Sequence, residues 1–132
     1  MTVFNPLHDP SALETRLATC PGQVVACYCA QWCDTCRKYY DSFTDLASRN
    51  PERTFIWIDI EESPELLGDI DVENFPTIAV QDASHTLFFG ALPPHIGHLE
   101  RLIRRADRPI DPARAAPPLL RQSMAASRAS NA

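Results

Sequence analysis

The chain contains the sequence Trp32-Cys33-Asp34-Thr35-Cys36, in which two cysteines stand three positions apart where an apolar stretch gives way to a helical pattern. Thiols at this spacing can close a small disulfide ring. Cys33 falls at the expected start of the helix, where unpaired N–H groups and the helix dipole favour a thiolate over a thiol. Because the same spacing also occurs in zinc sites and by chance, the flanking sequence decides what the pair indicates.

The sequence on either side of the pair predicts a strand followed by a helix. Residues 23–30 form a mostly apolar run, which is typical of a strand buried on both faces of a sheet. Over residues 34–49, aromatic and aliphatic side chains recur at helical spacing with charged ones between them. The pair therefore lies in an exposed turn between a strand and a helix.

The remaining pattern predicts an α/β fold. Beyond the strand and helix around the cysteine pair, we expect strands over 54–60, 77–80 and 86–89 and helices over 9–20, 63–68 and 95–106. The last two strands are close enough in sequence to form a hairpin. This order implies a mixed sheet whose parallel part comes first, with helices on both faces.

A single domain fits the length of 132 residues, and we place it at residues 1–107. Residues 108–132 are rich in Pro, Ala, Arg and Ser and hold too little apolar surface to pack by themselves, so we expect a flexible tail. In an alternative interpretation, Leu119, Leu120 and Met124 form one short helical face that binds a partner.

Charge and hydropathy limit the partners that this chain can have. Residues 1–107 carry 8 Lys and Arg against 16 Asp and Glu, which argues against nucleic acid as the main partner. No apolar run approaches the roughly 20 residues of a membrane helix, and the N-terminus lacks a signal-peptide pattern. We therefore expect a cytoplasmic monomer without membrane contact, in which the cysteines are thiols or a reversible pair.

Three motifs in register resemble those of the thioredoxin family. They are Ala30-Gln31-Trp32-Cys33-x-x-Cys36 after a buried strand, Phe75-Pro76-Thr77 before the next strand and Phe89-Gly90-Ala91-Leu92 before the final helix. The resemblance covers residues 1–107 and implies a thioredoxin-like three-layer sandwich with a mixed central sheet. It also implies a protein-disulfide reductase without a bound cofactor, acting on a disulfide-containing client protein and recycled by an external reductant or reductase.

The expected site combines two catalytic cysteines with a surface for the client. We expect Cys33, exposed at the start of the helix, to attack a client disulfide, and Cys36, buried one turn further on, to resolve the mixed disulfide. The resemblance implies a cis Pro76 against the disulfide, where the backbone of Phe75 pairs with an extended substrate strand. Trp32 is expected to pack beside the pair and shield it, and Gly90 is the fourth expected substrate-binding residue.

The chain departs from the family pattern at three places. Asp34-Thr35 stands between the cysteines in place of Gly-Pro, Cys27 occupies the position of a buried acid, and Trp57 occupies the position of a nearby lysine. The unusual loop and the missing buried acid, together with the basic stretch 108–132, favour an alternative function, in which the thioredoxin scaffold is a protein-binding or redox-sensing module with little turnover.

The other cysteines are expected to be structural. We expect the side chains of Cys27 and Cys29 to lie on opposite faces of their strand as inert core residues, although Cys29 is also a candidate for a third exchangeable thiol. That separation would keep four thiolates from converging on one ion, so no metal site is expected. Cys20 would merely end the first helix. The four histidines are expected to be exposed: His8, His85, His95 and His98.

Overall fold

The computed structural model of the chain describes residues 3–68, 70–72, 74–106, 108–110 and 116–124. The elements in chain order are β1 (Val3–Phe4), α1 (Pro10–Thr19), β2 (Val24–Cys29), α2 (Asp34–Ser48), β3 (Thr54–Asp59), the 3-10 helix η1 (Pro64–Leu67), β4 (Thr77–Gln81), β5 (Thr86–Ala91) and α3 (Ile96–Arg105). The elements predicted from the sequence are present close to their expected positions. The two-residue β1 was not predicted, because so short a segment carries no periodic pattern.

The strands form one mixed sheet in the order β1-β3-β2-β4-β5. β3 runs parallel to both β1 and β2, whereas β4 is antiparallel to β2 and to β5. A parallel pair needs a crossover connection, which α2 provides between β2 and β3, while the short β4–β5 connection makes a hairpin. The predicted mixed sheet, with its parallel part first, is confirmed.

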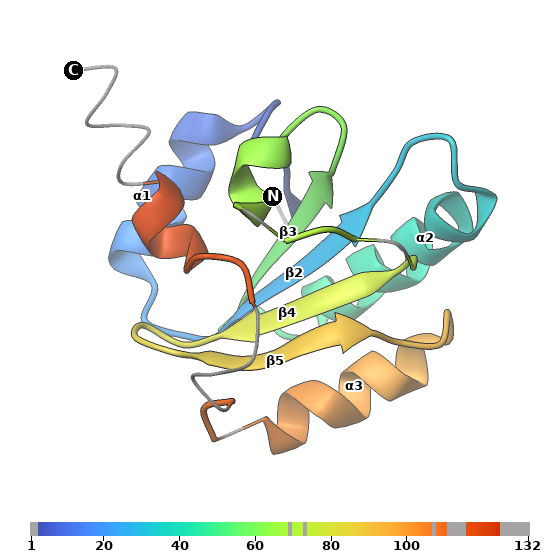
Figure 1. The fold of residues 1–132 in the computed structure, drawn as a ribbon. Coiled ribbons are helices and arrows are strands. Elements are labelled where there is room, and N and C mark those ends of the chain that lie inside the picture. The colour runs from blue at the N-terminus through green and yellow to red at the C-terminus, as the bar shows by residue number, and fades with distance from the viewer. Residues whose placement is uncertain (1–2, 69, 73, 107, 111–115, 125–132) are drawn as a thin grey trace.

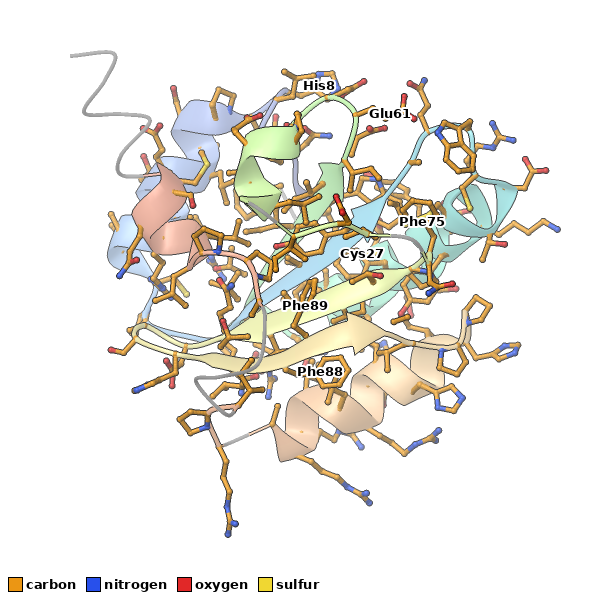
Figure 2. All side chains as sticks on the ribbon, in the orientation of Figure 1. His8, Cys27, Glu61, Phe75, Phe88 and Phe89 are labelled. Atoms are coloured by element: carbon orange, nitrogen blue, oxygen red, sulfur yellow. A yellow bond between two sulfur atoms is a disulfide. The ribbon has the colours of Figure 1, made fainter. Side chains whose placement is uncertain are left out.

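Helices cover both faces of the sheet, which makes the three layers that the resemblance implied (Figure 1). α2 and α3 pack on one face, and α1 and η1 pack on the other. Neighbouring residues on β5 show the division: Phe88 packs into the core on the α2 and α3 side, and Phe89 packs into the core on the α1 side (Figure 2). All six residues of β2 are buried, as expected for a central strand.

The described part of the C-terminal segment packs on the domain, contrary to the expected flexible tail. Residues 120–124 form a short helical turn beside α1 (Figure 1). Leu120 and Met124 are 1% and 5% exposed, within the core between α1 and the sheet. The apolar pair therefore completes this chain's own core instead of binding a partner. Residues 111–115 and 125–132, also part of the expected tail, lie outside the described residues.

Polar contacts explain why this segment docks where it does. The side chain of Gln81 is buried in β4, and its amide oxygen accepts a hydrogen bond of 3.0 Å from the Leu120 N–H. The guanidinium of Arg121 donates to the carbonyl oxygens of Leu17, Cys20 and Gly22 at and after the end of α1. A helix C-terminus leaves carbonyl groups without partners, and a cation is favoured there. The sequence did not reveal these partners, because Gln81 is 39 residues from Leu120 and the carbonyl groups that Arg121 binds are 99 to 104 residues from it in the chain.

A substitution in this segment tests whether it belongs to the domain. Leu120→Ala should lower the free energy of unfolding by about 2 to 5 kcal/mol, the usual cost of truncating a buried leucine. Leu119→Ala is the matched control, because Leu119 is only half-buried and should cost less than half as much. Urea denaturation followed by circular dichroism measures both. Equal midpoints for Leu120→Ala and the wild type would contradict the packing.

Candidate functional site

The two expected catalytic cysteines, at the start of α2, differ in their exposure to solvent. Cys33 is the N-cap of α2, where its N–H donates to the Ala30 carbonyl at 3.0 Å, and its side chain is partly exposed. Cys36 lies one turn into α2 and is 1% exposed. The helical pattern thus gives the exposure that was expected: an accessible first thiol and a buried second one.

A disulfide joins Cys36 to Cys29, with their Cα atoms 5.8 Å apart. Cys33 is a free thiol, as are Cys20 and Cys27. The sequence had suggested Cys33 as the partner of Cys36, so the bond in the structure differs from that expectation. It supports the alternative interpretation of Cys29 as a third exchangeable thiol.

The expectation that Cys27 and Cys29 point to opposite faces is wrong. Side chains alternate along a strand, so residues two apart share a face. Both side chains enter the core under α2, and their Sγ atoms are 3.7 Å apart (Figure 2 labels Cys27). Burial raises the pKa of the Cys27 thiol well above its ordinary value, so this cysteine holds its proton.

The argument against a metal site from the sequence assumed that Cys27 and Cys29 lie on opposite faces of β2, and that assumption fails. In the structure the disulfide takes the sulfur atoms of Cys29 and Cys36 out of the set of thiolate ligands. Within the described residues, no group of three or more His, Cys, Asp or Glu side chains is arranged to hold a metal ion. Three histidines, His8, His85 and His95, are exposed as expected, and His98 is half-buried.

Trp32 and Phe75 form an aromatic pair beside the cysteine loop. Their rings meet edge to face with centroids 5.6 Å apart, and Trp32 is 63% exposed. The indole N–H of Trp32 donates to the carboxylate of Glu61, which follows β3 (Figure 2 labels Glu61 and Phe75). Trp32 is thus held on the surface, next to the partly buried Phe75 and Cys33, where it can meet a partner.

The loop before β4 contains a cis peptide bond between Phe75 and Pro76. The carbonyl of Pro76 accepts a hydrogen bond of 3.2 Å from the Leu92 N–H. Gly90 lies opposite Ile78 in the hairpin and lines a separate pocket of about 210 Å³ with Thr77 and neighbouring loop residues. The structure therefore brings Trp32 and Phe75 together, and Gly90 lines a pocket with Asn74 and Thr77, which flank Phe75 and Pro76 in the chain.

Asp59, at the end of β3, is a positioning residue that the sequence analysis missed. One carboxylate oxygen accepts from the Gln31 N–H at 3.0 Å, and the other accepts from the N–H groups of Glu61 and Glu62. Asp59 therefore ties the cysteine loop to the loop that holds Glu61. An acidic residue at a strand end, followed directly by a turn, is the pattern that could have identified it.

A pocket of about 290 Å³ lies beside Cys36. Its apolar wall includes Tyr40 and Trp57, whose rings meet edge to face at 4.9 Å, and its polar wall includes Arg37 and Glu62. Arg37 also pairs with Asp34 on the exposed first turn of α2. The sequence marked Trp57 and Asp34 only as departures from the family pattern, and the structure places both next to the cysteine loop.

Cys20, expected to be merely structural, has its own electrostatic environment at the end of α1. A hydrogen bond from the Gly22 N–H is the largest cause that lowers the pKa of the Cys20 thiol, and it outweighs the opposing effect of partial burial. Arg16 and Arg121 act in the same direction. Cys20 is therefore a second accessible thiol with increased thiolate character.

Comparisons with known proteins agree with this architecture. The sequence model of the thioredoxin family matches residues 7–90. Thioredoxin H10 of Arabidopsis thaliana is 40% identical over 55 residues, which cover 42% of this chain and 36% of that protein. The chain spans less than half the length of the curated relatives it matches.

Two solved structures have a similar fold. The thioredoxin NaTrxh from Nicotiana alata has a TM-score of 0.66 and 15% identity, covering 81% of this chain and 94% of that chain. A chain in the complex of ferredoxin:thioredoxin reductase with thioredoxin f2 has a TM-score of 0.61 and 15% identity, covering 80% and 94%. Among the described residues, no helix is long and apolar enough to cross a membrane.

The thiols of Cys20 and Cys27 should respond to pH in opposite directions. Because the pKa of Cys20 is lowered, its thiolate persists to lower pH. The midpoint of its alkylation rate should therefore fall at a lower pH than in a peptide containing residues 14–26. Cys27 should remain unmodified in the folded protein, since burial keeps it protonated and inaccessible. Pulsed iodoacetamide labelling with mass spectrometry measures both. A Cys20 profile that coincides with that of the peptide would contradict the proposed environment.

Proposed function

Because this chain belongs to the thioredoxin family, we propose that it is a thiol–disulfide oxidoreductase acting on protein disulfides. The observation that carries the proposal is a partly exposed thiol, Cys33, at the N-cap of α2, with Cys36 buried one turn behind it. A thiolate at a helix N-terminus is favoured by the N–H groups and the dipole there.

In the proposed reaction, the fully reduced protein uses Cys33 and Cys36 in turn. The Cys33 thiolate attacks one sulfur of a client disulfide, forms a mixed disulfide and releases the other client sulfur as a thiolate. The Cys36 thiolate then attacks the Cys33 sulfur, which releases the second client thiolate and leaves a Cys33–Cys36 disulfide. The client gains two electrons, and the two cysteines lose them.

The client is proposed to dock on the surface formed by Trp32, Phe75 and Pro76. Trp32 offers an exposed ring, and an extended client segment would pair with the backbone of the half-buried Phe75. Pro76 itself is buried next to it in the chain. Gly90 lies on β5, and it would contact the client only if the client segment extends across β4 to β5.

An external reductant or reductase would restore the thiols. A protein of the same fold occurs in a structure with ferredoxin:thioredoxin reductase, which supports a reductase partner of this kind. We further propose that the protein works as a monomer in a reducing compartment, the cytoplasm, without nucleic acid, membrane or bound cofactor. The acidic balance of residues 1–107 supports the exclusion of nucleic acid.

A protein-binding or redox-sensing module with little turnover is the second candidate. The disulfide between Cys29 and Cys36 favours it, because a bonded Cys36 cannot resolve a mixed disulfide on Cys33. Cys27 and Trp57 also stand where the family pattern has a buried acid and a lysine, so Cys36 lacks proton transfer from those two positions.

Serine substitutions separate the roles of the two cysteines. Cys33→Ser should reduce the rate of insulin disulfide reduction, with dithiothreitol as the electron source, to the rate without protein. Cys36→Ser should instead accumulate a covalent complex with the client, because only an outside thiol can then release it. Insulin turbidity measures the rate, and non-reducing electrophoresis detects the complex.

Cys20→Ser is the control, since Cys20 lies at the far end of α1 and should leave the rate unchanged. Wild-type turnover by Cys36→Ser would show that another thiol resolves the complex. A wild-type protein that captures insulin without turnover would favour the binding module over the reductase.

A further inference from the structure

Four cysteines lie together between β2 and α2, namely Cys27, Cys29, Cys33 and Cys36, whereas the proposed reaction uses two. Cys29 and Cys36 form the disulfide, and each is 1% exposed. Cys33 keeps a free and partly exposed thiol at the N-cap of α2. The structure therefore holds an oxidised pair and the attacking thiol of the proposed reaction at the same time.

Cys27 lies against Cys29, whose sulfur is the leaving group when a thiolate attacks Cys36 and opens the Cys29–Cys36 disulfide. Its Sγ is 3.7 Å from that of Cys29, on the same face of β2. Because burial keeps Cys27 protonated, its S–H is a donor, although a weak one, for a Cys29 sulfur that carries negative charge. The core thus contains a polar partner for a Cys29 thiolate, among mostly apolar side chains.

We propose that Cys29 is a second resolving thiol that competes with Cys33 for Cys36. The Cys29 thiolate attacks the Cys36 sulfur of a Cys33–Cys36 disulfide, so the Cys29–Cys36 bond forms as the Cys33–Cys36 bond breaks. Cys33 leaves as a thiolate and takes up the proton that Cys29 lost. One disulfide is exchanged for another, and no electrons enter or leave the protein.

This exchange gives the oxidised protein a function that a two-cysteine site lacks. After the protein has reduced one client disulfide, its oxidised form is the buried Cys29–Cys36 disulfide. Cys33 is then again a free thiol at the surface. Cys33 can then form a second mixed disulfide, which Cys36 cannot resolve while it is bonded to Cys29. The protein would hold this second client covalently until the Cys29–Cys36 bond is opened.

Chymotrypsin makes the connectivity directly measurable. Cleavage after Tyr28 and Trp32 puts Cys29 on the peptide 29–32, and cleavage after Tyr39 puts Cys33 and Cys36 together on the peptide 33–39. The reduced protein is treated with one equivalent of hydroxyethyl disulfide, quenched in acid, alkylated and digested. Mass spectrometry should find 29–32 linked to 33–39, with Cys33 alkylated, in most molecules.

Two serine variants complete the test. Cys29→Ser should lose the linked peptides entirely and carry its disulfide within 33–39, so Cys33 is no longer alkylated. Cys27→Ser is the matched control on the same face of the strand and should retain the link. A wild-type protein whose disulfide lies within the peptide 33–39, with Cys29 alkylated, would overturn the proposal. Equal loss of the link between 29–32 and 33–39 in Cys29→Ser and Cys27→Ser would also overturn it.

The inference rests on the proposed function, because client reduction supplies the first disulfide, but the two can fail separately. The small disulfide oxidises the protein without any recognition of a protein client. A protein that does not reduce insulin and still shows the 29–36 link would overturn the reductase and retain the competing thiol. Insulin reduction without the 29–36 link would support the reductase and overturn the competing thiol.

Discussion

The burial of β2 on both faces is the constraint on which the site depends. Its six residues lie between β3 and β4, and helices cover the sheet above and below. Backbone groups in such a position are satisfied by the neighbouring strands, so the side chains decide what the core contains. Cysteine packs there as a small apolar residue and retains redox chemistry. The strand can therefore place reactive sulfur beneath α2 without the cost of burying a charge.

The fold was predictable where the pattern is long and local. The apolar run of β2, the amphipathic spacing of α2 and the hairpin signal before Thr86 each identify an element from its own residues. The exposure of Cys33 and Cys36 was predictable for the same reason, because both follow from their positions on one helix. β1 was not, since its two residues acquire their structure only by pairing with β3.

The features that the sequence did not predict depend on contacts between distant residues. The bonding of Cys36 to Cys29 depends on how α2 lies over β2, which spacing along the chain does not give. The mistake over Cys27 and Cys29 was different, because strand alternation alone places both on one face. The docking of residues 116–124 depends on Gln81 and on the end of α1, and composition alone suggested a flexible tail.

The docked C-terminal segment also affects the order in which the protein can fold. Its hydrogen bonds join Arg121 to residues 17–22 and Leu120 to Gln81, which gives contacts between the two ends of the chain. Contacts of such long sequence separation raise the contact order and slow folding. During synthesis, α1 and β4 emerge well before residue 120 does. The core between α1 and the sheet therefore stays uncovered during synthesis until residues 116–124 have been made and have docked.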